Sequence, residues 1–290
     1  MRAMPVGIIA AIAIPAATFA DVVTLTPSSD NSIYEHPLGL LSNGAGPGLF
    51  AGRTSQGLIR RALLRFDVAG AVPAGSTITS VTLSLNLSRS NSGDVECTLH
   101  RLLVDWGEGT SVAPGEGGRG TTPSAGDATW LHTFFDTSFW SSPGGQAGVD
   151  FIQTPSGSAT VGAALMPYQW SSTPGLVADV QSWLNAPGTN FGWMLVGGES
   201  APGSAKRFDS REHPEPSQRP KLTVTYSPPC YANCDGSTGT PLLTANDFQC
   251  FLNTFAAGAS YANCDGSTGT PLLTANDFQC FLNKFAAGCS

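Results

Sequence analysis

Arginine side chains recur at even spacing in two short stretches of the sequence. In RRALLRFD, the alternation of a β-strand puts Arg61 and Arg65 on one face and the apolar residues on the other. In KRFDSREH, Arg207 and Arg211 share a face for the same reason. A guanidinium group binds a carboxylate in a bidentate manner, so such pairs suit an acidic ligand. The spacing therefore predicts a cationic groove in a chain whose formal net charge is -7.

Tryptophan rings supply a second kind of contact, because an aromatic face packs against the apolar side of a sugar ring. Trp183 and Trp193 fall inside periodic segments and are expected in the core. The other tryptophans stand in loop-like contexts rich in Gly, Ser and Pro: Trp106, Trp130, Trp140 and Trp170.

The basic and aromatic residues together outline a candidate carbohydrate-binding site. Each arginine could instead form a solvated ion pair, which would contribute little to stability. Each loop tryptophan could instead pack inside the protein. An open groove with an exposed tryptophan would favour binding. Complete ion pairing with no exposed aromatic ring would favour a structural protein. The candidate residues are Arg53, Arg61, Arg65, Trp106, Trp130, Trp140, Lys206, Arg207, Arg211 and Glu212.

Catalytic motifs are missing from the sequence. No GxSxG, HExxH or Walker pattern occurs, and the four histidines are scattered. Asp105 and Glu108 form a possible carboxylate pair, but glycosidase chemistry depends on a separation that sequence does not give. We therefore predict a non-catalytic protein, with a polysaccharide lyase or hydrolase as the least favoured alternative. Asp30, Asp105 and Glu108 are also candidates for a structural Ca²⁺ site, because their oxygens suit that ion.

The elements that position these residues are predominantly strands. SVTLSLNLS (80–88) alternates apolar and polar residues, and four further strands are expected at 60–68, 95–104, 191–198 and 221–226. Only 175–185 has the spacing of an amphipathic helix. Charged residues make up 12% of the chain, and Gly and Pro are abundant. We predict an antiparallel β-sandwich of jelly-roll type over 21–227, and the acidic balance argues against a nucleic-acid partner.

This segment resembles the DNRLRE domain family. The resemblance lies in RRALLRFDVAGAVPAGSTITSVTLSL, ATW followed by a further Trp, LVADVQSWL, NFGWMLVG and FDSREHPEPSQRPKLTVTY, which occur in the family's order. It implies a β-sandwich similar to a carbohydrate-binding module, on a secreted bacterial protein often found beside polysaccharide-degrading enzymes. It also implies an anionic polysaccharide as the ligand.

The last part of the chain, 228–290, is a tandem repeat. Copies at 231–258 and 261–288 differ only where Thr254 is replaced by Lys284. Each copy predicts a loop followed by a helix, with a capping box at its start and an apolar stripe of phenylalanines at i, i+3 and i+7 and a leucine at i+4. Neither copy is long enough to bury a core alone, so the two helices are expected to pack together.

Six of the seven cysteines lie in this tail, which is expected for an exported module. Internal symmetry suggests Cys234–Cys250 and Cys264–Cys280, which leaves Cys230 and Cys289 to close the module. Fifteen pairings are possible for six cysteines, and symmetry is the only argument for this one. The remaining cysteine, Cys97, is expected to be a buried apolar residue.

The repeat also resembles a dockerin, and more closely the cysteine-containing dockerin-like tails of planctomycete-type secreted proteins. The resemblance implies a cohesin-like or cell-surface protein partner. NCDG resembles part of a calcium loop, although Tyr231 replaces the first ligand and five extra residues follow the glycine. A spacer without a partner is the alternative for this tail. The candidate calcium ligands are Asn233, Asp235, Asp247, Asn263, Asp265 and Asp277.

Residues 1–20 have the features of a signal peptide. Arg2 precedes a short apolar run, and small residues at Thr18 and Ala20 predict cleavage before Asp21. No other stretch is long and apolar enough to span a bilayer. The sequence therefore predicts a secreted or cell-surface protein that binds an acidic polysaccharide and is attached through its tail. The alternative is a structural cell-surface or matrix protein with no glycan ligand.

Overall fold

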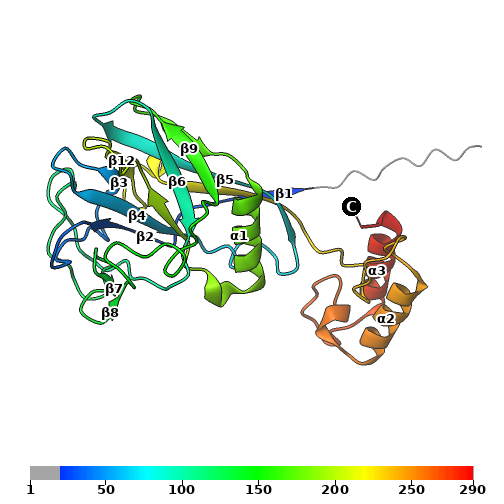
Figure 1. The fold of residues 1–290 in the computed structure, drawn as a ribbon. Helices are drawn as coiled ribbons and strands as arrows, with labels where there is room; N and C mark the ends of the chain where they lie inside the picture. Colours follow the sequence, from blue (N-terminus) through cyan, green and yellow to red (C-terminus); the bar gives the residue numbers. More distant parts are fainter. Residues whose placement is uncertain (1–19, 290) are drawn as a thin grey trace, which may run out of the picture. The chain divides into compact units, whose positions relative to one another are not determined.

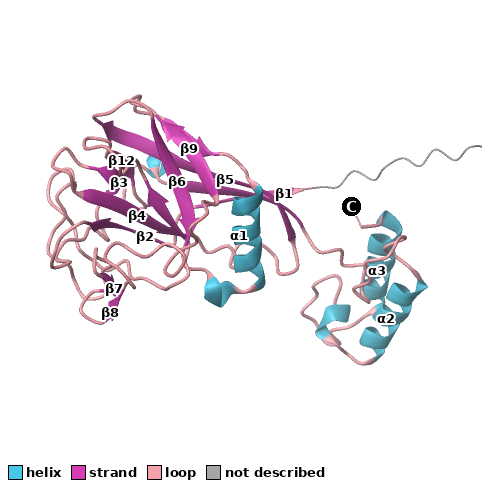
Figure 2. Ribbon diagram, in the orientation of Figure 1, coloured by secondary structure: helices cyan, strands magenta, loops and turns pink. Residues whose placement is uncertain are grey.

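The computed structural model describes residues 20–289, which form two compact units, 21–228 and the tail from 229 onward (Figure 1). The predicted signal peptide lies outside the described residues, apart from its last one. The first unit is mainly β and the tail is helical (Figure 2). No helix within 20–289 is long and apolar enough to cross a membrane.

The first unit is built on one curled sheet, which within the described residues has eleven strands, all paired antiparallel. Its main path runs β1-β13-β5-β12-β3-β4-β11-β6-β9, while β10 pairs with β5 and β2 with β4. The strands are β1 (Asp21–Leu25), β2 (Ser29–Tyr34), β3 (Gly48–Arg53), β4 (Ile59–Arg65), β5 (Thr77–Ser90), β6 (Val95–Arg101), β9 (Gly157–Val161), β10 (Pro167–Trp170), β11 (Trp193–Val196), β12 (Lys206–Asp209) and β13 (Lys221–Ser227).

The sheet folds over so that its two halves enclose the main core. Alternate residues of β5 are fully buried there, including Val81, Leu83 and Leu85, and they face residues from β4, β6 and β11. The helix α1 (Pro174–Asn185) begins at Thr173, whose hydroxyl accepts a hydrogen bond from the backbone N–H of Leu176. The β-sandwich class, the five strands and the single helix expected in this segment are therefore confirmed.

The other face of β4, β6 and β11 is covered by a long loop segment, 102–151. This segment contains a short hairpin, β7 (His132–Phe134) and β8 (Ser138–Phe139). Its tryptophans form a second apolar cluster with Leu63 of β4 and Met194 of β11. The face that carries Arg61 and Arg65 is therefore covered by protein. Two 3₁₀ turns complete the unit, at Pro187–Thr189 and Pro216–Gln218.

The tail consists of two nearly identical loop-helix copies. The helices α2 (Ala245–Ala256) and α3 (Ala275–Ala287) both begin with the predicted capping box, and a 3₁₀ turn (Ser260–Ala262) joins the copies. Phe251 and Phe281 are fully buried and stack with their ring centroids 4.0 Å apart. Each copy thus completes the apolar core of the other.

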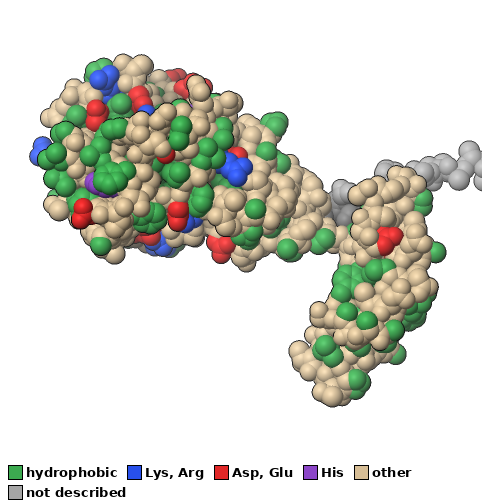
Figure 3. Space-filling view, turned by 60° about the horizontal axis from the view of Figure 1, so that its bottom comes forward, with side chains coloured by type: hydrophobic (Ala, Val, Ile, Leu, Met, Phe, Trp, Pro, Cys, Tyr) green, Lys and Arg blue, Asp and Glu red, His purple; other side chains and the backbone are tan. Residues whose placement is uncertain are grey.

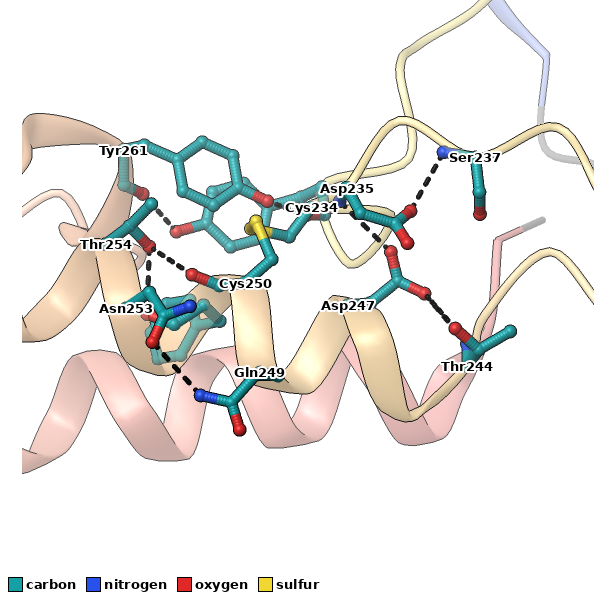
Figure 4. Close-up of a disulfide and its surroundings, with 12 residues drawn as sticks. Cys234, Asp235, Ser237, Thr244, Asp247, Gln249, Cys250, Asn253, Thr254 and Tyr261 are labelled. Atoms are coloured by element: carbon teal, nitrogen blue, oxygen red, sulfur yellow. Dashed lines mark hydrogen bonds between the residues drawn. A yellow bond between two sulfur atoms is a disulfide. The ribbon is translucent and has the colours of Figure 1, made fainter.

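Three disulfides hold the tail together, and they are those expected from its internal symmetry. Cys234 is bonded to Cys250 (Figure 4). Cys264 is bonded to Cys280 in the same way, so that each loop is tied to its own helix. Cys230 is bonded to Cys289 across 59 residues and closes the module. In the described residues, Cys97 is the free cysteine; it is buried, and burial raises the pKa of its thiol to about 12.

Candidate functional site

The tryptophans proposed for sugar stacking are buried. Trp106, Trp130 and Trp140 are 2%, 8% and 5% exposed, and Trp170 is fully buried. The indole N–H of Trp106 donates to the carbonyl oxygen of Phe191, and that of Trp140 donates to the carbonyl oxygen of Thr129. Because the loop segment 102–151 folds onto the sheet, its tryptophans become the core of that contact, which is the packing alternative that the sequence left open.

The two arginines of β4 are held beneath that same segment. Arg61 makes a bidentate ion pair with Glu199, with nitrogen–oxygen distances of 2.7 and 2.9 Å. Its guanidinium also lies 5.5 Å from the ring centroid of Trp130. Arg65 pairs with Asp105 and lies over the ring of Trp106. Both arginines anchor the covering segment to the sheet.

The basic residues near β12 are also engaged. Arg207 Nη1 lies 3.2 Å from Asp209, and Arg211 Nη2 lies 2.6 Å from Glu108 and 3.0 Å from Glu212. Arg61, Arg65, Arg207 and Arg211 are thus all ion-paired, which is the condition set for a structural protein. The remaining predicted arginine, Arg53, donates to the carbonyl oxygen of Gly57.

Lys206 is fully buried, and although it is one of the residues that line the pocket described below, its ammonium group is already engaged by the protein. Its ammonium group donates hydrogen bonds of 2.7 to 3.1 Å to four oxygens, from Ser90, Ser92, Gly93 and Gly162. Four acceptors leave the ammonium no free proton for a ligand. Lys206 therefore ties the end of β5 to the loop after β9.

A pocket of about 380 Å³ opens where β3, β12 and the end of β5 meet. The residues that line it come from stretches that are far apart in the sequence. Arginines dominate its polar lining, Phe50 supplies an apolar wall, and Glu116 is the carboxylate at its edge. The residues that matter for its chemistry are Phe50, Arg60, Arg89, Asn91, Glu116 and Arg207.

Two of these arginines have no carboxylate partner within 20–289. Arg89 is exposed, and its side chain makes no hydrogen bond or ion pair in that range. Arg60 is 5% exposed; Nη1 donates to the carbonyl oxygen of Ile59, and Nε is buried without a partner. Burial lowers the pKa of Arg60, and the nearby Tyr34 and Glu35 offset this in part. An anion in the pocket would compensate the buried charge.

The strand register adds to the positive charge of the pocket. Arg89 of β5 is directly opposite Arg207 of β12, in the pair that precedes a register shift. Like charges in directly opposed positions destabilise a sheet. Arg207 has Asp209 and a distant Glu116 to balance it, whereas Arg89 has neither. An anion bound beside the two arginines would therefore reduce the repulsion between them.

Sequence reasoning missed Arg60 and Arg89 as site residues. Arg60 was recognised only as a member of the basic stretch, and Arg89 ends a strand whose other polar residues are serines, threonines and one asparagine. Arg89 and Arg207 are 118 residues apart, so only the β5–β12 pairing brings them together. No single stretch of the sequence carries that signal.

The proposed Ca²⁺ trio of the first unit is only partly assembled. Asp30 and Glu108 are adjacent, since the backbone N–H of Asp30 donates to Glu108 Oε1 at 2.8 Å. Asp105 instead pairs with Arg65. Glu212 takes its place near the other two carboxylates. Asp105 and Glu108, the possible carboxylate pair of a glycosidase, are therefore each bound to a different arginine.

The candidate calcium ligands of the tail organise its loops through hydrogen bonds. Asp247 accepts from the backbone N–H of Asp235 at one oxygen and from that of Thr244 at the other (Figure 4). Asn233 donates to the carbonyl oxygen of Ser237, which leaves its own side-chain oxygen buried without a partner in the described residues. The second copy repeats these bonds at Asn263, Asp265 and Asp277.

A scan against protein-family models found no match, and a search of characterised proteins found none either. The resemblances to the DNRLRE family and to dockerins therefore stay predictions, and the function has to be argued from the site.

Proposed function

We propose that the first unit is a non-catalytic binding module for an acidic polysaccharide, and that its site is the pocket of Arg60, Arg89 and Arg207. The tail would attach this module to a protein partner or to the cell surface. Three disulfides, and no membrane-crossing helix within residues 20–289, are compatible with an extracellular protein.

One observation carries this proposal. Arg60 and Arg89 line the same pocket, and neither is paired with a carboxylate of the described chain. The surface is otherwise sparsely charged, as its visible face shows (Figure 3). A uronic acid carboxylate would bind both guanidinium groups and would also balance the opposed Arg89 and Arg207.

The size and the lining of the pocket support the same ligand class. A volume of about 380 Å³ falls in the range of ~300–1,000 Å³ that is usual for small-molecule sites. Phe50 offers an apolar wall, and the amide of Asn91 offers both a donor and an acceptor for hydroxyl groups. A segment of polymer with one acidic group in the pocket would pair its carboxylate with the arginines, pack its apolar face on Phe50 and form hydrogen bonds with Asn91.

The decisive experiment is affinity electrophoresis of the full chain in gels that contain neutral or acidic polysaccharides. We expect retardation by an acidic polymer, with loss of retardation in Arg89→Ala and weakening as salt rises. Arg119→Ala is the matched control, because Arg119 is also exposed, makes no ion pair within 20–289 and does not line the pocket. Equal retardation of both variants would reject the pocket as the site.

A structural surface protein is the second candidate, and a specific observation favours it. The four arginines first proposed for binding are all ion-paired, and their neighbouring tryptophans are buried. If no polymer in the panel retards the wild-type chain, this alternative replaces the binding module. The tail would then be the part of the molecule in which to search for a partner.

A further inference from the structure

Three carboxylates meet at a point where three distant segments converge. Asp30 lies in β2, Glu108 follows β6 in the covering loop segment, and Glu212 follows β12. One oxygen of each lies within 4.8 Å of the others. None of the three lines the arginine pocket. This group of residues, which we call the carboxylate cluster, is therefore a separate feature of the first unit.

One oxygen of the cluster has no partner. Asp30 is 1% exposed; its Oδ2 accepts from the backbone N–H of Arg211 at 2.8 Å, but its Oδ1 is buried and accepts nothing within 20–289. A buried carboxylate oxygen of this kind needs a proton or a cation.

The charge within the cluster is only partly balanced. Arg211 Nη2 contacts Glu108 Oε2 and Glu212 Oε1, at 2.6 and 3.0 Å. Its guanidinium makes no ion pair with Asp30, which accepts a hydrogen bond from the backbone N–H of Arg211 instead. With all groups ionised, three negative charges face one positive charge, and the group keeps a net charge of −2. A divalent cation would neutralise it.

We propose that the carboxylate cluster binds a calcium ion through Asp30 Oδ1 and the carboxylates of Glu108 and Glu212. Hard oxygen ligands suit Ca²⁺, which is held at about 2.3–2.6 Å. Two oxygens on opposite sides of the ion are then about 4.6–5.2 Å apart, so a cluster within 4.8 Å needs little rearrangement. Mg²⁺ demands near-ideal octahedral geometry and gives up its water ligands reluctantly, so a site of three protein carboxylates favours Ca²⁺.

The exposure of the cluster gives the ion a path from solvent. The side chains of Glu108 and Glu212 are 18% and 22% exposed, whereas Asp30 is enclosed. Water would fill the coordination positions that remain. The ion would then join β2, the covering segment and the turn after β12. These segments are already linked here by Arg211 and by the hydrogen bond from the backbone N–H of Asp30 to Glu108.

The test is thermal unfolding of the full chain with and without calcium, followed by tryptophan fluorescence. All six tryptophans lie between 106 and 193, so this signal reports the first unit and not the tail. We expect calcium at a hundredfold excess over Kd to raise the midpoint by about 5–10 °C. Asp30→Asn should abolish that rise and still fold, because the new amide can donate to the neighbouring carboxylates.

Two controls locate the effect. Asp105→Asn removes a carboxylate outside the cluster and should keep the full calcium response. The double variant Asp247→Asn/Asp277→Asn removes the last candidate carboxylate ligand of each loop of the tail and should also keep the calcium response. If Asp30→Asn does not fold, Arg211→Ala replaces it; loss of the competing guanidinium should enlarge the calcium response.

Three results would overturn the proposal. The wild-type midpoint could be unchanged by calcium up to about 10 mM, which exceeds the range of weak extracellular sites; Asp30 would then carry a proton. The response could persist in Asp30→Asn, which would place the ion elsewhere. It could also disappear in the tail variant, which would assign it to the repeats.

Discussion

Arg89 lies directly opposite Arg207 across the β5–β12 pair, and only Arg207 has a carboxylate partner within residues 20–289. In most sheets, opposed positions hold residues that attract each other, because cross-strand pairs are a main source of sheet stability. Two arginines in such positions cost stability in the free protein. This arrangement is the expected one if the sheet is adapted to an anionic ligand.

Removal of Arg89 should therefore stabilise the free protein. We expect Arg89→Ala to gain about 0.2–1 kcal/mol in the free energy of unfolding, since it relieves repulsion from Arg207. Urea unfolding followed by tryptophan fluorescence measures this, and the gain should shrink as salt screens the repulsion. Arg119→Ala, with no opposed arginine, should change stability by less than about 0.5 kcal/mol. A marked destabilisation by Arg89→Ala would show that Arg89 is structural.

Lys206 should behave as a structural residue. Lys206→Met keeps the length of the side chain but leaves four oxygens without their donor. We expect a loss of about 1–3 kcal/mol in the free energy of unfolding. Lys221→Met on β13, whose ammonium makes no hydrogen bond within the described residues, should be nearly neutral. If Lys206→Met instead removes polysaccharide retention at unchanged stability, Lys206 contacts the ligand.

The tail should lose stability in acid. Burial opposes ionisation of Asp247 and Asp277, but hydrogen bonds from backbone N–H groups outweigh it, and both pKa values lie below their usual range. The folded tail therefore binds fewer protons than the unfolded one. The stability that these groups contribute is present above their unfolded pKa and is lost as pH falls through the folded pKa.

Amide hydrogen exchange in α2 and α3 between about pH 5 and pH 2 measures that loss. The double variant Asp247→Asn/Asp277→Asn should start with lower protection and respond less to pH. Protection that is the same in the wild-type tail at both ends of this range would contradict the assignment. The disulfides remain closed throughout, so any change reports the capping carboxylates.

Local patterns in the sequence were sufficient for much of the fold. The alternation of 80–88 identified the centre of β5, and the spacing of phenylalanines identified α2 and α3. Symmetry between the copies gave all three disulfides. Each of these features depends on residues that are near in the chain or repeated in it, so the physical cause is visible in one stretch.

The candidate site depends on contacts that sequence does not show. The loop segment 102–151 covers the outer face of β4 and buries Trp106, Trp130 and Trp140. It also engages Arg61 through the carbonyl oxygen of Gly144 and Arg65 through Asp105. Gly/Ser-rich composition suggested an open loop, but its apolar residues find a partner in the sheet. The pocket likewise requires the register of β5 against β12, which follows from the whole topology.

The two copies of the tail repeat form an interface with each other within one chain. Tyr231 and Tyr261 stack 4.9 Å apart, and each donates its hydroxyl to the backbone carbonyl of the other. Each repeat therefore packs against the other copy as one subunit of a homodimer packs against its partner. A chain that lost one copy by recombination would expose half an interface, and would have to recover the missing half from another molecule.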